Sequence, residues 1–253
     1  DNLMLLDASG AVKEVDFIGN VYPVGEKQMI QCCIRDHSGP RSIEQLEQQH
    51  QADVLRSFQG MVSALVTLSE ARDPYACGHQ GRVAHLAAAI GAELGLNADE
   101  VEGLRISGLV HDIGKFAIPS EILSKPSALR PEELALVRTH VQQGYDVLAS
   151  IPFPWPVAET VLHHHERLDG SGYPQGLQGE AISLGGRILA VADTVEAMAT
   201  HRPYRASAGI EAALATIQAG RDRLFDPAVV DACLRLFQER SYALISAGTA
   251  IQA

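Results

Sequence analysis

The chain has 253 residues, 46% of them hydrophobic and 20% charged, which is enough apolar material for a substantial core and excludes a disordered tail or a disulfide-stapled mini-protein. Its 20 Lys and Arg residues against 31 Asp and Glu residues give a formal net charge of −11, opposite to that of non-specific nucleic-acid or anionic-membrane binders. The apolar runs are shorter than the ~20 residues of a membrane span and the four cysteines lack paired spacing, so we expect a soluble, cytoplasmic protein without a nucleic acid polymer as partner.

The N-terminal segment, residues 1–38, predicts β-structure. Short apolar runs at 15–18, 21–24 and 29–34 follow a turn signal at 7–10, which indicates about three strands. Three strands are too few for a self-sufficient domain, so we expect a partial β segment. The chain begins with Asp1 rather than Met and shows no apolar leader, and we therefore expect no export signal and a longer natural protein.

Residues 39–72 predict a long helix with a possible coiled-coil seam. Apolar side chains recur at Val54, Phe58, Met61, Leu65 and Leu68, the a/d rhythm of a coiled coil. The clean seam covers about two heptads, fewer than the three to four that indicate a coiled coil by themselves. Two interpretations stay open: a single helix that packs on the following domain, and a parallel homodimer through this helix.

Residues 73–253 predict an all-α bundle, so the expected fold class is mainly α with a small N-terminal β segment. Proline and glycine residues separate segments whose apolar residues recur with helical periodicity. The expected helices lie near 78–95, 98–115, 131–150, 155–167, 184–200, 208–219 and 227–239.

Candidate metal ligands are distributed over these helices. The sequence separation between successive candidates is about the length of one helix and the helix that returns beside it. Neighbouring helices can therefore direct these side chains to a common point. The set comprises five imidazoles and two carboxylates: His79, His111, Asp112, His140, His164, His165 and Asp193. A mixed nitrogen and oxygen set favours iron or manganese, with zinc or nickel as alternatives, and disfavours metals that prefer thiolates.

The surroundings of the two carboxylates support a metal site. Asp112 follows the largely apolar run 106–110, and Asp193 follows the apolar run 188–192. A buried carboxylate without a cation or hydrogen-bond donors is costly. A buried hydrogen-bonded network of histidines and aspartates is the alternative. For His85, His163 and His201 we favour surface or supporting positions over ligand roles.

Two motifs resemble the HD-GYP family, a branch of the HD metal-dependent phosphohydrolases. The first is His111-Asp112 followed by Ile113-Gly114-Lys115, and the second runs from His164-His165-Glu166 to Gly172-Tyr173-Pro174. The resemblance extends from about residue 73 to 237. It includes Asp73-Pro74-Tyr75, Gly78-His79, Ile118-Pro119, Lys125-Pro126, Thr139-His140, Ala190 to Asp193, and Arg202-Pro203-Tyr204-Arg205.

The resemblance implies hydrolysis of the bacterial second messenger cyclic di-GMP to linear pGpG, and further to GMP, by a metal-bridging hydroxide. It assigns the seven candidates above as ligands of two or three divalent metals, with Asp112 as the bridge. Lys115 reaches a phosphate or the attacking hydroxide, and Arg202 and Arg205 pair with phosphates. The Gly172-Tyr173-Pro174 loop shapes the guanine pocket and contacts a partner such as a GGDEF-domain protein. Two metals and these cations suit attack on an anionic phosphodiester.

Some positions depart from the family pattern. Ala76 stands where relatives often have Thr, and Glu196 stands where many have Asp; neither is an expected ligand. Trinuclear relatives add a carboxylate about one turn before the first histidine, a position held here by Tyr75. This favours two metals, although Asp73 lies near enough to leave three open.

The front of the chain weakly resembles another family. Residues 3–36, running into a helix, resemble the closing strands of a PAS sensor domain, which implies that the helix of residues 39–72 transmits a signal to the hydrolase. Two other functions remain open for the whole chain. One is a catalytically weak scaffold that binds cyclic di-GMP, and the other is an HD phosphohydrolase for another cyclic dinucleotide or a nucleotide monoester.

Overall fold

The computed structural model describes residues 2–6, 9–10, 12–25, 27–36, 38–72, 78–125, 127–200 and 207–244. It divides the chain into two compact units, Asp1–Gly60 and Met61–Ala253. The predictions for Asp73, Tyr75, Ala76, Arg202 and Arg205 lie outside the described residues.

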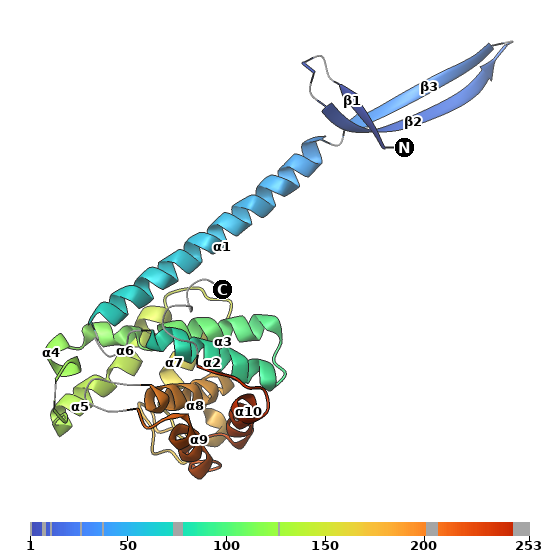
Figure 1. Cartoon of the computed structure of the whole chain (residues 1–253). Coiled ribbons are helices and arrows are strands. Elements are labelled where there is room, and N and C mark those ends of the chain that lie inside the picture. Colours follow the sequence, from blue (N-terminus) through green and yellow to red (C-terminus); the bar gives the residue numbers. More distant parts are fainter. Residues whose placement is uncertain are drawn as a thin grey trace. The chain divides into compact units, whose positions relative to one another are not determined.

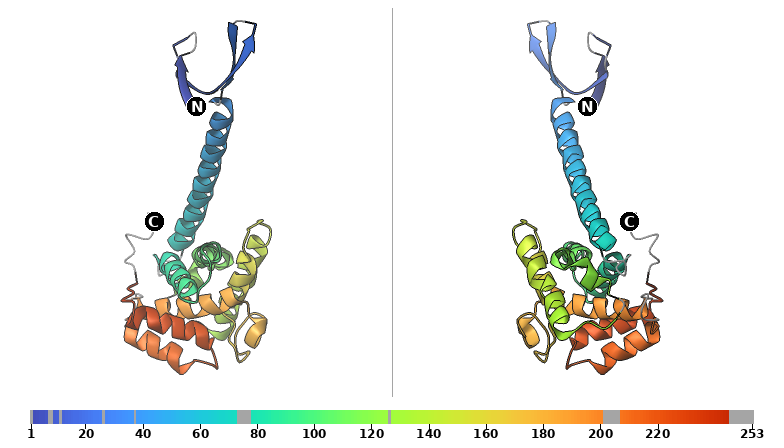
Figure 2. Two further views of the ribbon diagram at one scale, coloured as in Figure 1. Left: turned by 90° about the vertical axis from the view of Figure 1, so that its right-hand side faces the viewer. Right: turned by 90° about the vertical axis from the view of Figure 1, so that its left-hand side faces the viewer.

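The first unit contains a three-stranded antiparallel sheet in the order β1-β2-β3, as predicted (Figures 1 and 2). The strands are β1 Asn2–Leu6, β2 Val12–Val24 and β3 Lys27–Asp36. In the long β2–β3 hairpin, Val21 pairs with Ile30. Both side chains are largely exposed, and only Val15 among the described apolar strand residues is buried. The described side chains of the sheet therefore present exposed apolar surface.

Helix α1, Ser38–Arg72, confirms the predicted long helix (Figure 1). Val54, Met61, Leu65 and Leu68 of the predicted seam are exposed. Within the second unit, Val62 and Ser69 of the same helix are buried.

The second unit is a helical bundle, which confirms the predicted fold class. Its elements are the α-helices α2 His79–Glu93, α3 Ala98–Val110, α4 Ser120–Leu123, α5 Pro131–Arg138, α6 His140–Leu148, α7 Val157–His163, α8 Leu184–Ala199, α9 Ile210–Ala219 and α10 Pro227–Gln238, and the 3₁₀ helices η1 Ile113–Ala117 and η2 Gly179–Ala181. Among the described helices, none is both long enough and apolar enough to cross a bilayer.

The core of the bundle is formed by apolar residues of α2, α3, α8, α9 and α10. Leu86, Ile90, Ile188, Leu189 and Ile217 are fully buried. Helix α8 is central because its residues 188–192 are buried without a break, as expected for a helix enclosed by neighbours. This burial holds the first turn of α2 and the middle of α8 in fixed positions.

Three expected helices are shorter than the sequence pattern predicts or are interrupted. The helix expected over 155–167 spans only Val157–His163. The helix expected over 98–115 ends at Val110 and continues as η1, where a Cβ on Gly114 would lie 1.9 Å from the carbonyl oxygen of His140. The helix expected over 131–150 is interrupted at Thr139, whose hydroxyl donates to the carbonyl of Leu136 at 2.7 Å. Side chains that form hydrogen bonds with nearby carbonyls compete with the backbone hydrogen bonds of a helix. The close packing of η1 on α6 is the second cause of these interruptions.

Candidate metal centre

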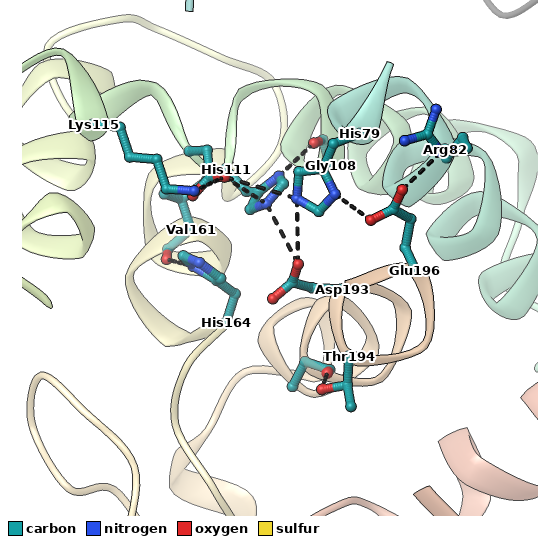
Figure 3. Close-up of polar contacts among 12 residues, drawn as sticks. His79, Arg82, Gly108, His111, Lys115, Val161, His164, Asp193, Thr194 and Glu196 are labelled. Carbon is teal, nitrogen blue, oxygen red and sulfur yellow. Dashed lines mark hydrogen bonds and ion pairs between the residues drawn. The ribbon is translucent and has the colours of Figure 1, made fainter. Parts of the chain in front are cut away.

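Seven side chains from five helices or helix ends form one cluster (Figure 3 labels four of them). His79 opens α2, His111 and Asp112 follow the last turn of α3, and His140 opens α6. His164 and His165 follow α7, and Asp193 lies in α8. These are the seven ligands proposed from the sequence. Each lies at or near a helix end except Asp193, so the bundle directs them inward without a long loop.

The ring nitrogens of three histidines have defined roles. The Nδ1 atoms of His111, His140 and His164 each donate to the carbonyl three residues earlier, at 2.7, 2.7 and 2.5 Å. A carbonyl oxygen only accepts, so Nδ1 carries the proton and Nε2 keeps its lone pair. Hydrogen bonds of this kind orient the imidazole of metal-binding histidines. The three rings are therefore held ready to bind a cation through Nε2.

The Nε2 atoms of His140 and His164 test whether a metal fits. Both are buried and have no hydrogen-bond partner among the described residues. A buried polar atom without a partner is unfavourable, and a lone pair directed into a group of other ligand atoms is satisfied by a cation. His140, His164 and His165 offer nitrogen atoms within 4.8 Å of one another, and His79, His111 and Asp193 form a second such group. The donor set therefore fits metal binding.

Asp112 lies between the two groups. Its Oδ1 is 3.5 Å from Nε2 of His140, and its Oδ2 is 3.5 Å from Nε2 of His111 and 3.8 Å from Nε2 of His79. Its two oxygens thus face opposite histidine groups. Lys115 donates to Oδ2 at 2.7 Å from the first turn after the pair (Figure 3). The Asp112 carboxylate therefore lies between the two histidine groups and also accepts a hydrogen bond from Lys115.

The protonation states of Asp112, Asp193, His164 and His165 suit metal binding. Burial raises the pKa of Asp112, but the charge of Lys115 and the neighbouring histidines outweigh it and hold that pKa well below its ordinary value. Burial also raises the pKa of Asp193, but the hydrogen bond from His79 and the nearby histidines outweigh it and hold that pKa well below its ordinary value. Burial lowers the pKa of His164 well below its usual value and that of His165 to about 3. Near neutral pH the carboxylates are ionised and these imidazoles are neutral.

Glu196 orients the first histidine of the cluster. Its carboxylate accepts from Nδ1 of His79 and, at 2.7 Å, from Nε of Arg82 (Figure 3). Nε2 of His79 consequently faces Asp193 at 3.4 Å. The sequence pattern predicts no ligand role for Glu196, and the structure gives it a supporting contact instead. Its position one turn after Asp193 on α8 is the sequence signal that could have indicated this contact.

We expect Glu196→Gln to weaken metal binding about 10- to 100-fold, because an amide holds the imidazolium or imidazole of His79 less firmly than a carboxylate. Metal titration of the protein after chelation measures the effect. Glu102→Gln is the matched control, since the Glu102 carboxylate bonds the guanidinium of Arg105. Equal affinities of the Glu196→Gln protein and the wild type would contradict the role of Glu196.

The loop after His165 is fixed by a buried carboxylate that sequence reasoning missed. Glu166 accepts backbone hydrogen bonds from Gln175, Gly176 and Leu177 at 2.7, 3.1 and 3.1 Å. A Cβ on Gly172 would lie 2.4 Å from the Cα of Glu166, so the loop closes tightly on the segment that carries the ligands. The position of Glu166 next to His165 in the sequence does not predict these hydrogen bonds, because they depend on how the loop folds.

The predicted loop residues Tyr173 and Pro174 lie beside the cluster. The ring centroids of Tyr173 and His165 are 4.8 Å apart. Among the other histidines, Nδ1 of His163 accepts from the backbone amide of Ser183 at 3.2 Å, which fits a supporting position, and His85 is half-buried on α2. His201, Arg202 and Arg205 lie outside the described residues.

Comparison with known proteins places this chain among HD domains. The HD domain family model matches residues 63–229. The cyclic di-GMP phosphodiesterase response regulator RpfG of Xanthomonas campestris is 43% identical over 176 residues, which cover 69% of this chain and 47% of that protein. A cyclic di-GMP phosphodiesterase of Thermotoga maritima is 39% identical over 181 residues, 71% of this chain and 49% of its own. The chain therefore spans about half the length of these curated relatives.

Some relatives are named for a different substrate. Solved structures share the fold of this chain. The 3′3′-cGAMP-specific phosphodiesterase 1 of Vibrio cholerae is 42% identical over 143 residues, 56% of this chain and 33% of that protein. The crystal structure of V-cGAP3 from V. cholerae, a cyclic GMP-AMP specific phosphodiesterase, superposes with a TM-score of 0.55 at 21% identity. It covers 76% of this chain and 51% of that chain. At this identity the structural likeness shows the fold alone.

Proposed function

This chain belongs to the HD domain family, and from that premise we propose that it is an HD-GYP-type phosphodiesterase that hydrolyses cyclic di-GMP to linear pGpG and further to GMP. The observation that carries the proposal is Asp112, whose two oxygens face two separate groups of histidines. The names of the relatives from X. campestris and T. maritima support cyclic di-GMP as the substrate.

The proposed centre holds two divalent ions, with iron or manganese favoured by the mixed nitrogen and oxygen ligands. His140, His164 and His165 would hold one ion, His79, His111 and Asp193 the other, and Asp112 both. When bound, the ions would lower the pKa of a water molecule and neutralise charge on the phosphoryl oxygens.

The remaining residues act on the substrate in this proposal. Lys115 holds a proton beside Asp112 and supplies a positive charge for a phosphate oxygen. Arg202 and Arg205 add bidentate donors to phosphates, a role that rests on the motif they share with relatives. The Gly172-Tyr173-Pro174 loop walls one side of the site, with the Tyr173 ring beside His165.

A substrate panel tests the proposal. The full chain, purified without oxygen and loaded with Fe²⁺ or Mn²⁺, should convert cyclic di-GMP to pGpG, observed by product chromatography. The panel includes 3′3′-cGAMP, cyclic di-AMP and nucleoside monophosphates, because relatives in V. cholerae are named for cGAMP. Tight binding of cyclic di-GMP without turnover under any metal would favour a signalling scaffold. Turnover of another substrate alone would favour a different HD phosphohydrolase.

Metal binding should release at least one proton per chain at neutral pH. Burial lowers the pKa of His79, but hydrogen bonds and charges from Asp193 and Glu196 outweigh it and raise that pKa to about 9. A metal at Nε2 must displace this proton, so apparent affinity should rise as the pH increases toward that value. Calorimetry in buffers of different ionisation enthalpy counts the protons. Binding at pH 7 with no proton release would contradict the assignment of His79.

The N-terminal unit completes the proposal as a sensory input. We propose that residues 1–38 are PAS-derived, that residues 39–72 form a signalling helix, and that residues 73–253 are the hydrolase. Apolar side chains exposed on β2 and β3 suit a sheet that packs against another surface. A GGDEF-domain protein is a proposed partner of the Gly172-Tyr173-Pro174 loop. A nucleotide messenger as substrate favours the cytoplasm.

We further propose a homodimer through α1, on the evidence of its exposed Val54, Met61, Leu65 and Leu68 at a/d spacing. Light scattering should give a dimer mass for the wild type and a monomer mass for Met61→Glu, because a buried, unpaired carboxylate disrupts a seam. Gln59→Glu, at an exposed polar position of the same helix, is the control. A monomeric wild type would contradict the dimer.

A further inference from the structure

A pocket of about 220 Å³ lies between α3, α7 and the first turn of α8, and none of the seven proposed metal ligands lines it. Figure 1 shows these three helices within the second unit. Leu96, Leu104, Trp155 and Ile188 contribute to a largely apolar wall. An apolar cavity of about 150 Å³ is enough to bind benzene, so the volume of this pocket suits a small molecule with one ring.

One end of the pocket is the N-terminus of α8. Ser183 caps this 16-residue helix, because its hydroxyl accepts from the amide of Gly186 at 3.3 Å. Leu184 and Gly185 come before Gly186, and both line the pocket. The first amides of a helix have no acceptor within it, and no described residue accepts from these two amides. Two donors and the positive end of the helix dipole therefore adjoin the pocket.

A buried hydroxyl adds a third donor at the same end. Thr160 of α7 lines the pocket and is only 3% exposed. A Cβ on Gly185 would lie 2.5 Å from Oγ1 of Thr160, so this hydroxyl faces the first turn of α8. Among the described residues, none forms a hydrogen bond with it. A buried polar group without a partner is unfavourable, and an acceptor atom of a ligand at this end would satisfy the hydroxyl.

An anion suits these donors better than a neutral acceptor. Carboxylates accept charge-assisted hydrogen bonds from backbone amides, and the N-terminus of a helix favours negative charge. Glu100 also lines the pocket, but it is exposed, and its carboxylate accepts from the amide of Asn97 at 2.9 Å. Its charge is therefore solvated and held at the cap of α3, where it opposes a bound anion only weakly.

We propose that this pocket binds a small aromatic carboxylate, with the ring against Trp155 and the carboxylate at Thr160 and the first amides of α8. The inference goes beyond the proposed function, because no proposed metal ligand lines the pocket. Ser107 and Thr160, which line it, lie one helical turn before His111 and His164. A bound acid would therefore contact two of the helices whose ends carry metal ligands.

Titration of the full chain with benzoate and with benzamide tests the site. The two probes have the same ring and nearly the same shape, but benzamide is neutral and places an amino group against the donors. Trp155 is the only tryptophan of the chain, so its fluorescence reports occupancy of this pocket directly. We expect a saturable change of this emission with benzoate, and an affinity about tenfold higher for benzoate than for benzamide, the factor of one hydrogen bond to a charged group.

Two substitutions remove single donors. Thr160→Val keeps the shape of the side chain and removes the hydroxyl. Leu184→Pro removes the first amide donor of α8, at a position that proline occupies readily because this amide has no acceptor in the helix. The ψ angle of Ser183, 147°, is also one that proline allows in the residue before it. Each change should lower the ratio of the benzoate and benzamide affinities by about threefold or more.

The matched controls are Thr216→Val and Leu184→Ala. Thr216 lies on α9 and does not line the pocket, and alanine at position 184 keeps the backbone amide, so both proteins should keep the wild-type ratio. Absence of a saturable response to benzoate, or equal affinities of the wild type for the two probes, would overturn the site even if a variant fails to fold. A ratio unaltered in folded Thr160→Val and Leu184→Pro proteins would overturn it as well. None of these results depends on hydrolysis of cyclic di-GMP.

Discussion

Asp112→Asn should lose at least about a thousandfold in phosphodiesterase activity, together with at least one bound metal. The asparagine has the same size, but it carries no charge and offers only one oxygen to the two histidine groups that Asp112 faces at 3.5 Å on each side. Loss of a metal that supplies several kcal/mol of transition-state stabilisation corresponds to this factor. Metal analysis and turnover of cyclic di-GMP on the same preparation measure both effects.

The control for this change is Asp231→Asn. The Asp231 carboxylate pairs with Arg221 at 2.7 Å, and both side chains are about two-fifths exposed, so the change should leave activity and metal content intact. Asp112→Asn protein that keeps two metals and the wild-type rate would refute the bridging role. Full activity of that protein after the loss of one metal would refute the need for two.

Gly114→Ala should destabilise the second unit by about 3 kcal/mol or more and abolish activity. A Cβ at this position would lie 1.9 Å from the carbonyl oxygen of His140 and 2.5 Å from the amide nitrogen of Gly144. These are backbone atoms of α6, so no side-chain rotation relieves the clash. Separation of η1 from α6 would move Asp112 away from His140. Thermal unfolding and metal content measure the damage.

Gly60→Ala is the matched control for this substitution. Gly60 lies within α1, and a Cβ there meets nothing within 4 Å. Alanine should stabilise the helix by about 1 kcal/mol, because glycine is a poor helix former. Gly114→Ala protein that melts like the wild type and binds metal normally would show that η1 and α6 can separate without cost, contrary to the packing described.

The sequence predicted most of the fold because the apolar periodicity of its helices is strong and proline and glycine separate them. The break at Thr139 was not predictable from periodicity, since apolar residues continue across it. It depends on a hydroxyl that bonds Leu136 and on the approach of Gly114 to His140. These are contacts between elements, and a pattern along one element does not contain them.

The candidate site, like the fold, was predictable from the sequence only in part. The convergence of the seven proposed ligands was predictable because they recur at regular intervals along the chain, all but Asp193 near helix ends, and the structure brings them together. The role of Glu166 was not predictable, because its hydrogen bonds arise from a loop that folds back onto it. The predicted phosphate contacts Arg202 and Arg205 lie outside the described residues and stay predictions.

The most direct test of the central claim is the metal content of the full chain purified without oxygen, measured together with the products it forms from cyclic di-GMP. Two clusters of nitrogen and oxygen ligands joined by Asp112 predict about two iron or manganese ions per chain and pGpG as a product. A chain that binds no metal, or that forms pGpG at an undiminished rate after complete chelation, would contradict the account.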